Sequence, residues 1–411
     1  MLDETKLELR KWADVSAYFL VLISLFFLPV STSLNALFVV AAFLALFGLR
    51  FQQNARQILS FKTTQWTLAL IGVFFIGILY SSAPMPEAWL AFKKYGFRLF
   101  AFMILPPLFC RPQSRNYVFY TLIAGSVIYS LFDVLDQIDL ISLTALFDKP
   151  KHVLLSQLPF GYYCAFSSLV TLFLVSTRHD KKMLFSALLA YQCFYLFFMN
   201  AERAPLVVFI VMAFVFLCRK LNVKQKVKML IPAIVIVGCI GMLSPVLKDR
   251  VAFIYHDLQE YKQGNVNTSL GLRAEYMRHS FQIIKQKPLF GFGTGSFATE
   301  YSKTRGPNVN VTDKTLGDPH NSYVHIWVQL GLVGVIVFLG WLFYQWKFST
   351  RLLSNERILL RCFLLAFMLS CLSEAAFYRS RNANLYLVLA VVCMGNAFQP
   401  RRKIRRYYKK R

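Results

Sequence analysis

The sequence is a succession of apolar segments, most of them close to the length that a helix needs to cross a lipid bilayer. Twelve such segments lie near residues 13–30, 34–49, 66–80, 97–109, 117–133, 159–176, 183–199, 204–218, 227–243, 322–345, 357–373 and 384–398. A hydrocarbon core about 30 Å thick requires roughly 17–25 apolar residues per helix. The 16% of charged residues is also well below what soluble domains carry. We therefore predict an all-α polytopic membrane protein with about twelve transmembrane helices.

The 46 lysines and arginines are unevenly distributed among the segments that connect these spans. If the N-terminus is cytoplasmic, twenty-eight of them fall on the cytoplasmic side, whereas eight fall in the short loops of the opposite side. Basic residues concentrate in the cytoplasmic loops of membrane proteins, so this asymmetry predicts that both termini are cytoplasmic. Membrane topology thereby accounts for the formal net charge of +26, and we expect no nucleic-acid partner.

One segment on the outer side is far longer than the others and covers residues 244–321. Its apolar residues recur with helical spacing from Arg273 to Gln286, and a glycine-rich turn follows at 291–295. Long loops in compact proteins are commonly functional, and this pattern predicts a folded loop. The predicted organisation is nine spans in 1–243, the extracytoplasmic loop in 244–321, three spans in 322–398 and a basic cytoplasmic tail in 399–411.

A polar segment, Asp318-Pro-His-Asn-Ser322, immediately precedes the tenth span. Asn321 or Ser322 suits the N-cap of a helix, which places His320 close to a helix N-terminus at the membrane surface. The positive end of the helix dipole disfavours an imidazolium there, and a neutral imidazole is what a general base requires. His320 is therefore a candidate general base. The alternative is a histidine that only hydrogen-bonds the loop.

Two arginines on the same predicted side are candidates for binding an anionic substrate. Arg203 stands at the outer end of the seventh span, directly before Ala204 and Pro205, and Arg273 lies at the start of the predicted loop helix. A charge near the membrane core is costly unless it is paired or reaches the interface. The alternatives for Arg203 are snorkelling and a salt bridge with Glu202. For Arg273 the alternative is an ordinary solvated arginine.

Other patterns in the sequence indicate structural roles. Lys93, Lys94 and Arg98 are interpreted as interface anchors on the outer side. The eight cysteines form no CxxC pair and lie in or beside apolar stretches, so we expect packing roles and neither disulfides nor a zinc site. The sequence shows no Asp, Glu and His spacing typical of metal ligation, and we expect no metal and no other cofactor.

The segment around His320 resembles the ligases of the O-antigen ligase and polymerase superfamily. Their signature is His, then Asn, Ser or Gln, nine residues, and Gly-x-x followed by Gly, Thr or Tyr. Here His320-Asn321 is followed by nine residues and then by Gly331-Leu-Val-Gly334, so the match is complete. By this resemblance Asn321, Gly331 and Gly334 are supporting residues of the site.

Two further parts of the chain are similar to the same superfamily. The loop helix that begins near Arg273 and the turn Pro288-Leu-Phe-Gly-Phe-Gly293 resemble the family's loop pattern. Arg203 falls where the family has an arginine, although Ser or Gly commonly flanks that position and Glu202 and Ala204 flank it here. The resemblance covers roughly residues 190–345 well and the remainder only in hydropathy and number of spans.

The resemblance implies a glycosyltransferase of GT-C-like architecture in the inner membrane of a Gram-negative bacterium, with its active site in the periplasm. The donor would be O-antigen on undecaprenyl pyrophosphate, and the acceptor a sugar hydroxyl of lipid A–core. Transfer would be metal-independent and inverting. His320 would take the proton of the acceptor hydroxyl, and Arg203 and Arg273 would clamp the pyrophosphate, because guanidinium groups are permanently charged and bidentate.

Three other functions stay open at the level of the sequence. An O-antigen polymerase uses the same donor with a second lipid-linked glycan as acceptor, but the His-Asn-x9-Gly-x-x-Gly spacing favours the ligase. A protein O-oligosaccharyltransferase usually carries a larger outer domain than the present loop. A lipid-linked oligosaccharide flippase predicts charges deep within spans and repeated halves, and we find no internal repeat.

Overall fold

The computed structural model describes residues 2–31, 34, 36–142, 157–200, 202–225, 227–229, 232, 245–304 and 318–398. These residues form helices and contain no strand, which confirms the all-α prediction. The helices before the long loop are α1 (Leu2–Phe26), α2 (Ala36–Phe47), α3 (Leu49–Ser60), α4 (Lys62–Leu79), α5 (Met85–Ile104), η1 (Pro106–Phe109), α6 (Pro112–Gln137), α9 (Gln157–Thr177), η2 (His179–Lys181), α10 (Lys182–Phe194), η3 (Tyr195–Met199), α11 (Arg203–Leu217) and η4 (Cys218–Lys220). The later helices are α13 (Pro245–Lys262), α14 (Ser269–Gln286), α15 (Phe297–Thr304), α16 (Ser322–Ser349), α17 (Ser354–Ser373), α18 (Ser380–Met394) and η6 (Gly395–Phe398).

The membrane-spanning character of the bundle follows from helix length and apolarity. Five segments of the described residues are long and apolar enough to cross a membrane: α4, α6, α9, the run from η2 to η3, and α16. The pair α2 and α3, bent by 91° at Gly48, makes a sixth if it is one broken span. Together they indicate a multi-pass membrane protein. The prediction of about twelve spans stays a prediction, because most of 227–243 and the tail at 399–411 lie outside the described residues.

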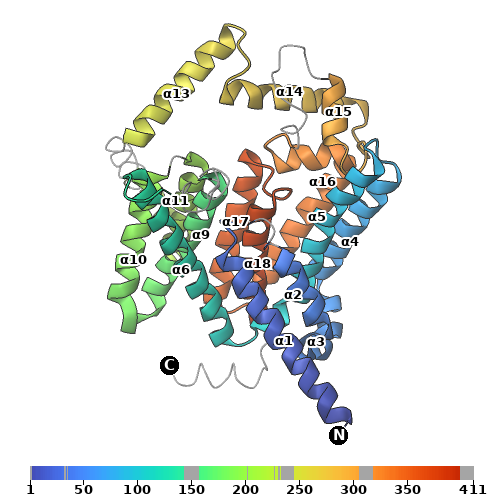
Figure 1. The fold of residues 1–411 in the computed structure, drawn as a ribbon, viewed down its shortest axis with the longest axis vertical. Coiled ribbons are helices and arrows are strands. Elements are labelled where there is room, and N and C mark those ends of the chain that lie inside the picture. The colour runs from blue at the N-terminus through green and yellow to red at the C-terminus, as the bar shows by residue number, and fades with distance from the viewer. Residues whose placement is uncertain are drawn as a thin grey trace.

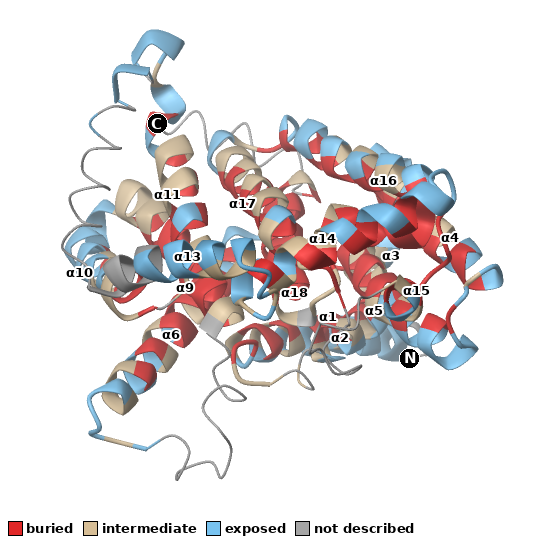
Figure 2. Ribbon diagram, turned by 90° about the horizontal axis from the view of Figure 1, so that it is seen from above, coloured by how far each residue is buried: buried red, intermediate tan, exposed pale blue. Residues whose placement is uncertain are grey.

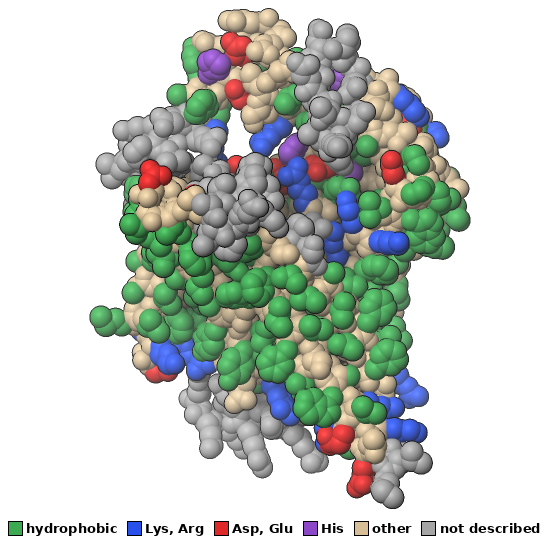
Figure 3. Space-filling model, in the orientation of Figure 1, with side chains coloured by type: hydrophobic (Ala, Val, Ile, Leu, Met, Phe, Trp, Pro, Cys, Tyr) green, Lys and Arg blue, Asp and Glu red, His purple; other side chains and the backbone are tan. Residues whose placement is uncertain are grey.

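The distribution of buried, apolar and charged side chains is typical of a helical bundle in a lipid bilayer. Buried residues lie on the inward faces of the helices (Figure 2) and form one large apolar core. On the face seen in Figure 3, hydrophobic side chains form a belt around the middle of the bundle, and charged side chains gather at its two ends. Large apolar residues such as Phe75, Ile336 and Phe343 are about half exposed on this outer surface. Lipid tails, rather than water, suit such a surface.

The helix predicted near 97–109 is longer and more embedded than the sequence suggested. α5 begins at Met85 and ends before Pro106, and it includes Lys94 and Arg98. Arg98 is 6% exposed and donates to the carbonyl oxygens of Phe377 and Tyr378 at 3.3 and 3.2 Å. Lys94 donates to the Tyr378 hydroxyl at 2.9 Å. The interpretation of these two residues as interface anchors is therefore wrong, since both hold the loop before α18.

The long loop folds over one end of the bundle, where α13, α14 and α15 lie across the tops of the other helices (Figure 1). The predicted helix at Arg273–Gln286 is confirmed as α14, and Thr268 caps it by accepting from the Gly271 amide at 3.1 Å. A second apolar cluster joins α14 and α15 to the first turns of α16, and its members include Tyr276, Tyr301 and Val328. This packing attaches the loop helices to the start of α16.

The glycine-rich turn enters a break in α16. Gly331 has φ 63° and ψ −165°, a conformation that essentially only glycine adopts. The break exposes backbone groups, and the turn pairs with them: the Phe292 and Gly293 amides donate to the carbonyls of Val328 and Gln329 at 3.0 and 2.7 Å. The Leu332 amide returns a bond to the Pro288 carbonyl at 2.9 Å. The predicted glycine-rich turn is confirmed, and it locks the loop to α16.

We expect Gly331→Ala to destabilise the protein. The required backbone conformation costs a residue with a side chain about 1–3 kcal/mol, and the added Cβ would also meet the Leu289 carbonyl. The matched control is Gly72→Ala in α4, where a Cβ meets nothing within 4 Å and alanine favours the helix. Thermal unfolding of the purified variants should show a lower apparent melting temperature for Gly331→Ala alone. Equal melting temperatures would contradict the role assigned to the break.

Candidate active site

The segment before α16 is tied to the end of α17 by a helix cap. Asn321 is the N-cap residue, and its side-chain oxygen accepts from the Val324 amide at 3.0 Å. Its side-chain nitrogen donates to the Leu372 carbonyl at 3.0 Å. The predicted capping role is confirmed, and the same side chain holds the start of α16 beside the end of α17.

His320 precedes this cap in a conformation that turns its ring toward the loop helices. Its φ is 53°, in the left-handed region that histidine adopts more readily than most residues. The backbone amide donates to Oδ1 of Asp318 at 3.0 Å, a local bond that supports the turn. The imidazole lies 5.8 Å from the Tyr276 ring of α14 and is 28% exposed. The ring is therefore supported on one side and open to a ligand on the other.

The closest carboxylate to the imidazole is that of Glu374, which directly follows α17. Nδ1 of His320 lies 3.3 Å from Oε1 of Glu374, whose side chain is 1% exposed. Nη2 of Arg379, which can only donate, lies 3.5 Å from the same Nδ1. The carboxylate, which when ionised only accepts, is closer, and this shorter contact favours the tautomer with the proton on Nδ1. Nε2 then carries the lone pair. A histidine whose Nδ1–H is held by a carboxylate is oriented to accept a proton at Nε2.

Arg379 compensates the charge of the two buried carboxylates in the site. Its Nε lies 3.1 Å from Oδ2 of Asp318, and its Nη1 lies 3.1 Å from Oε2 of Glu374 in an ion pair without hydrogen-bond alignment. Burial raises the pKa of Asp318, but the charges of Arg379, His325 and His320 outweigh it and lower that pKa below its usual value. Burial lowers the pKa of Arg379, and the two carboxylates outweigh it and raise it. Both shifts favour the charged forms, so Asp318 and Arg379 stabilise each other's charge.

Arg273 reaches the same carboxylate from α14. Its Nη2 lies 3.9 Å from Oε1 of Glu374, while half of its side chain is exposed. It is the fifth residue of α14, one turn further along than the sequence suggested. The structure therefore brings two of the predicted site residues, His320 and Arg273, to one glutamate. Half of the side chain stays in contact with solvent, so the assignment of Arg273 to an anionic substrate stays a prediction.

Arg203 begins α11 at the same end of the bundle. A Cβ on Gly161 of α9 would meet the Pro205 ring, two residues from Arg203. The next residue, Tyr162, lies 3.1 Å from the Ser373 hydroxyl, and Ser373 adjoins Glu374. The structure thus places Arg203 at the start of a helix, α11, that packs against both α9 and α17.

The supporting glycines act on the scaffold. Gly331 provides the break in α16, and a Cβ on Gly334 would meet Leu330 within the same helix. Neither needs to contact a substrate to support the site, because both determine where the first turns of α16 lie. Gln329, two residues before the break, accepts from the Gly295 amide at 2.6 Å and continues the attachment of the turn.

Sequence reasoning missed three members of the cluster: Asp318, Glu374 and Arg379. No role was assigned to Glu374 or Arg379 from the sequence. The loop between the last two predicted spans carries both Glu374 and Arg379, and it is predicted to lie on the same side of the membrane as His320. An oppositely charged pair in that loop was the signal that could have indicated partners for His320. Among the described residues, no group of three His, Cys, Asp or Glu side chains is arranged to hold a metal ion.

Comparison with known proteins adds a family to this geometry. Residues 185–339 match the family model described as O-antigen ligase. This part of the chain is therefore similar to the O-antigen ligase family. A Haemophilus influenzae relative, described as an uncharacterized protein, is 22% identical over 182 residues, which is 42% of this chain and 46% of that protein. The chain thus matches about half the length of this relative.

The residues that match the family model include Arg203, Arg273 and His320, whereas Glu374 and Arg379 lie beyond them. The matched segment alone therefore does not complete the cluster, and α17 with the loop before α18 supplies the rest.

We expect Arg379→Gln to destabilise the protein by about 1–3 kcal/mol, because it leaves buried carboxylates without compensation. The loss stays below that of a fully buried ion pair, since the Arg379 side chain is 35% exposed and solvent screens part of the charge. The matched control is Lys303→Gln, since Lys303 forms an ion pair with Glu300 at 2.7 Å but is 58% exposed. Exposed pairs of this kind contribute roughly 0–1 kcal/mol. Denaturant or thermal unfolding of the purified variants measures both. Adding Glu374→Gln to Arg379→Gln should recover part of the loss, and no recovery would contradict the charge argument.

Proposed function

We propose that the protein is an O-antigen ligase that transfers O-antigen from undecaprenyl pyrophosphate to a sugar hydroxyl of lipid A–core. The observation that carries the proposal is the contact between Nδ1 of His320 and the buried carboxylate of Glu374 at 3.3 Å, beside Arg273. His320 and Arg273 lie in the segment that matches the O-antigen ligase family model. A base and a half-exposed guanidinium at one point suit transfer of a glycan from a phosphate leaving group.

His320 is the general base of this proposal, and Glu374 is its positioning residue. Nε2 of His320 removes the proton of the acceptor hydroxyl while the hydroxyl oxygen attacks the anomeric carbon of the donor. The bond between that carbon and the phosphate oxygen breaks, and undecaprenyl pyrophosphate leaves with the electron pair. Attack opposite to the leaving group inverts the anomeric centre. Glu374 stabilises the imidazolium that forms.

Arg273 and Arg203 are the groups that we assign to the pyrophosphate. Arg379 already pairs with Asp318 and Glu374 at 3.1 Å. Arg273 is half exposed and lies as far as 3.9 Å from Glu374, so its guanidinium can still bind another anion. A guanidinium can bind two phosphate oxygens in parallel. A fixed donor that stabilises the charge developing on a leaving group typically lowers the activation free energy by about 3–4 kcal/mol. Such donors would allow transfer without a metal.

The location of the reaction follows from the same proposal. The distribution of lysine and arginine favours cytoplasmic termini, so α13, α14, α15 and the site would face the periplasm of a Gram-negative inner membrane. The donor lipid would lie along the apolar outer surface of the helices. Lipid A–core would approach from the same membrane leaflet. This arrangement keeps both substrates anchored while their reacting groups meet above the bundle.

The test is a transfer assay with purified protein, lipid A–core and undecaprenyl-pyrophosphate-linked O-antigen. We expect a high-mass lipopolysaccharide ladder that survives EDTA. His320→Ala should lower the transfer rate by about 10²–10⁴-fold, the usual contribution of a general base. The matched control is His256→Ala, because His256 is exposed on α13; this variant should retain the ladder.

Each other outcome of the assay identifies a different function. No ladder from folded protein, with chain growth when lipid-linked repeat units serve as both donor and acceptor, would mean a polymerase. Transfer to a protein acceptor would mean an oligosaccharyltransferase. Movement of intact donor across a vesicle membrane without transfer would mean a flippase. A ladder that requires a divalent metal would contradict the metal-independent mechanism.

Glu374→Gln tests whether Glu374 positions the base. Without the carboxylate, Nδ1 loses the partner that selects its tautomer, so we expect kcat to fall, but by no more than the roughly 10²–10⁴-fold that a general base contributes. The KM for the donor should stay within about two-fold, because a positioning residue acts on the chemical step. Steady-state kinetics with varied donor give both constants. A raised KM with unchanged kcat would assign Glu374 to substrate binding instead.

A further inference from the structure

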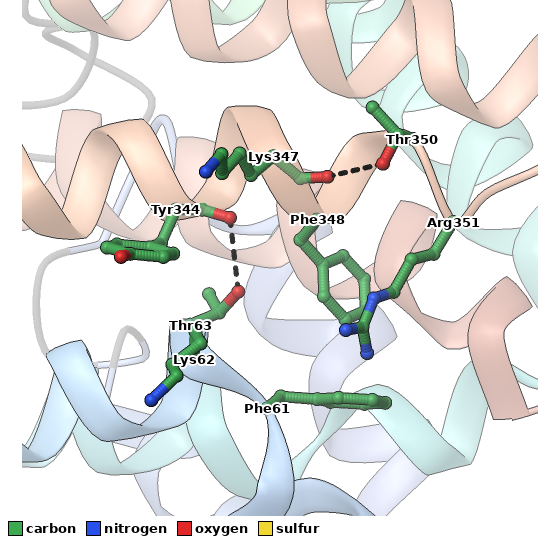
Figure 4. Close-up of a pocket in the computed structure, with 8 residues that line it drawn as sticks. All are labelled: Phe61, Lys62, Thr63, Tyr344, Lys347, Phe348, Thr350 and Arg351. Carbon is green, nitrogen blue, oxygen red and sulfur yellow. Dashed lines mark hydrogen bonds between the residues drawn. The ribbon is translucent and has the colours of Figure 1, made fainter.

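A cavity of about 520 Å³ lies at the end of the bundle opposite to His320. It opens where α4 begins and α16 ends, and Figure 4 shows the side chains around it. The lining residues are Phe61, Lys62, Thr63, Tyr344, Lys347, Phe348, Thr350 and Arg351. Ser322 begins α16 and Ser349 ends it, so this cavity and the candidate active site occupy the two ends of one helix.

The charges in the cavity are all of one sign. Lys62, Lys347 and Arg351 are exposed cations, and none of the eight lining residues is acidic. No ion pair within the described part of the chain neutralises any of the three. Two of them lie over aromatic rings instead: the Arg351 guanidinium is 5.2 Å from the Phe61 ring centroid, and Lys347 Nζ is 5.8 Å from that of Tyr344. The cavity therefore favours an anion.

The first turn of α4 adds to this positive potential. Its N-cap residue is Phe61, which supplies no side-chain hydrogen bond to the helix. The backbone amides of a helix start carry the positive end of the dipole and bind phosphate readily. Phe61, Lys62 and Thr63 of this first turn form one wall of the cavity, so the uncapped turn and the three cations act on the same space.

The wall opposite to the first turn of α4 is braced and aromatic. The Thr63 hydroxyl donates to the Tyr344 carbonyl at 3.3 Å, and the Thr350 hydroxyl donates to the Lys347 carbonyl at 2.8 Å (Figure 4). The Phe61 and Phe348 rings meet edge to face at 5.0 Å. The cavity is thus a formed feature, with its apolar floor supplied by packed rings.

The cavity adjoins an apolar surface that is suited to contact with lipid. α4 and α16 are both candidate membrane spans, and they pack against each other. Ile336, Leu339 and Phe343 of α16 are about half exposed along the apolar outer surface that leads away from the cavity. Aromatic and basic residues together mark the membrane interface. An anion with apolar chains fits this combination better than a free anion, because both parts find matching surfaces.

We propose that this cavity binds the phosphate headgroup of an anionic membrane phospholipid, with Lys347, Arg351 and Lys62 around the phosphate and the acyl chains along α4 and α16. Basic pockets at the ends of transmembrane helices bind anionic headgroups by the same physics. The lipid is separate from both substrates of the transfer reaction and binds at the opposite end of α16.

The experiment is lipid titration of the full-length purified protein in detergent, followed by native mass spectrometry. We expect phosphatidylglycerol to bind more tightly than phosphatidylethanolamine. The double variant Lys347→Gln with Arg351→Gln should bind phosphatidylglycerol about 25-fold more weakly, because each basic group near an anionic headgroup contributes a factor of about five. The matched control is Lys181→Gln with Lys182→Gln, two exposed lysines outside the cavity, which should bind like the parent.

Further arms separate the lipid from other ligands. Inorganic phosphate alone, at the same concentration as the lipid, should leave bound phosphatidylglycerol in place; displacement would assign the cavity to a free anion. A photoactivatable phosphatidylglycerol should label the peptide containing Tyr344 to Arg351, and excess unlabelled lipid should suppress the labelling. Equal binding of both phospholipids, or parent-like binding by the double variant, would overturn the proposal.

Discussion

The carboxylate of Glu374 imposes the constraint on which the candidate site depends. A carboxylate that is 1% exposed has lost almost all of its contact with water. Hydrogen-bond donors and positive charges of the protein must therefore replace the water molecules that would stabilise it. His320, Arg273 and Arg379 do so from three separate parts of the chain. His320 and Arg379 make the closer contacts, at 3.3 and 3.1 Å, and the carboxylate holds them in place. A site assembled around one buried charge is precise because displacing either of these two partners exposes the cost of that charge.

Helix ends make this convergence possible. Glu374 follows α17, His320 precedes α16, and Arg379 precedes α18, so all three stand where backbone direction changes and side chains can turn inward. The Asn321 cap then connects two of these ends. The break at Gly331 adds the loop, because the turn at 288–293 satisfies the backbone groups that the break would leave unpaired. The helices that carry the chemistry and those that cross the membrane are thus one packed unit.

Local physics explains which features the sequence predicted. The N-cap at Asn321, the helix of Arg273 and the glycine-rich turn each depend on residues within a few positions of one another, so pattern and propensity suffice. The partners of His320 do not share this property. Glu374 and Arg379 lie 54 and 59 residues further along the chain, and only packing of α16 against α17 and α18 brings them back. The length of α5 was missed for the same reason, since Arg98 is tolerated there only because the carbonyls of Phe377 and Tyr378 receive it.

Arg379 and Arg273 differ in how closely they pair with the carboxylates of the site. Asp318 and Glu374 bring two negative charges, and Arg379 alone makes close contacts with both. The remaining negative charge attracts Arg273, but at 3.9 Å and with half of the side chain exposed this attraction is weak. A diphosphate offers a guanidinium two parallel hydrogen bonds and a higher charge than one carboxylate. Under the proposed function, Arg273 therefore moves toward the donor at low cost, and Glu374 is left to His320 and Arg379. Binding of the donor would in this way strengthen the contact that orients the base.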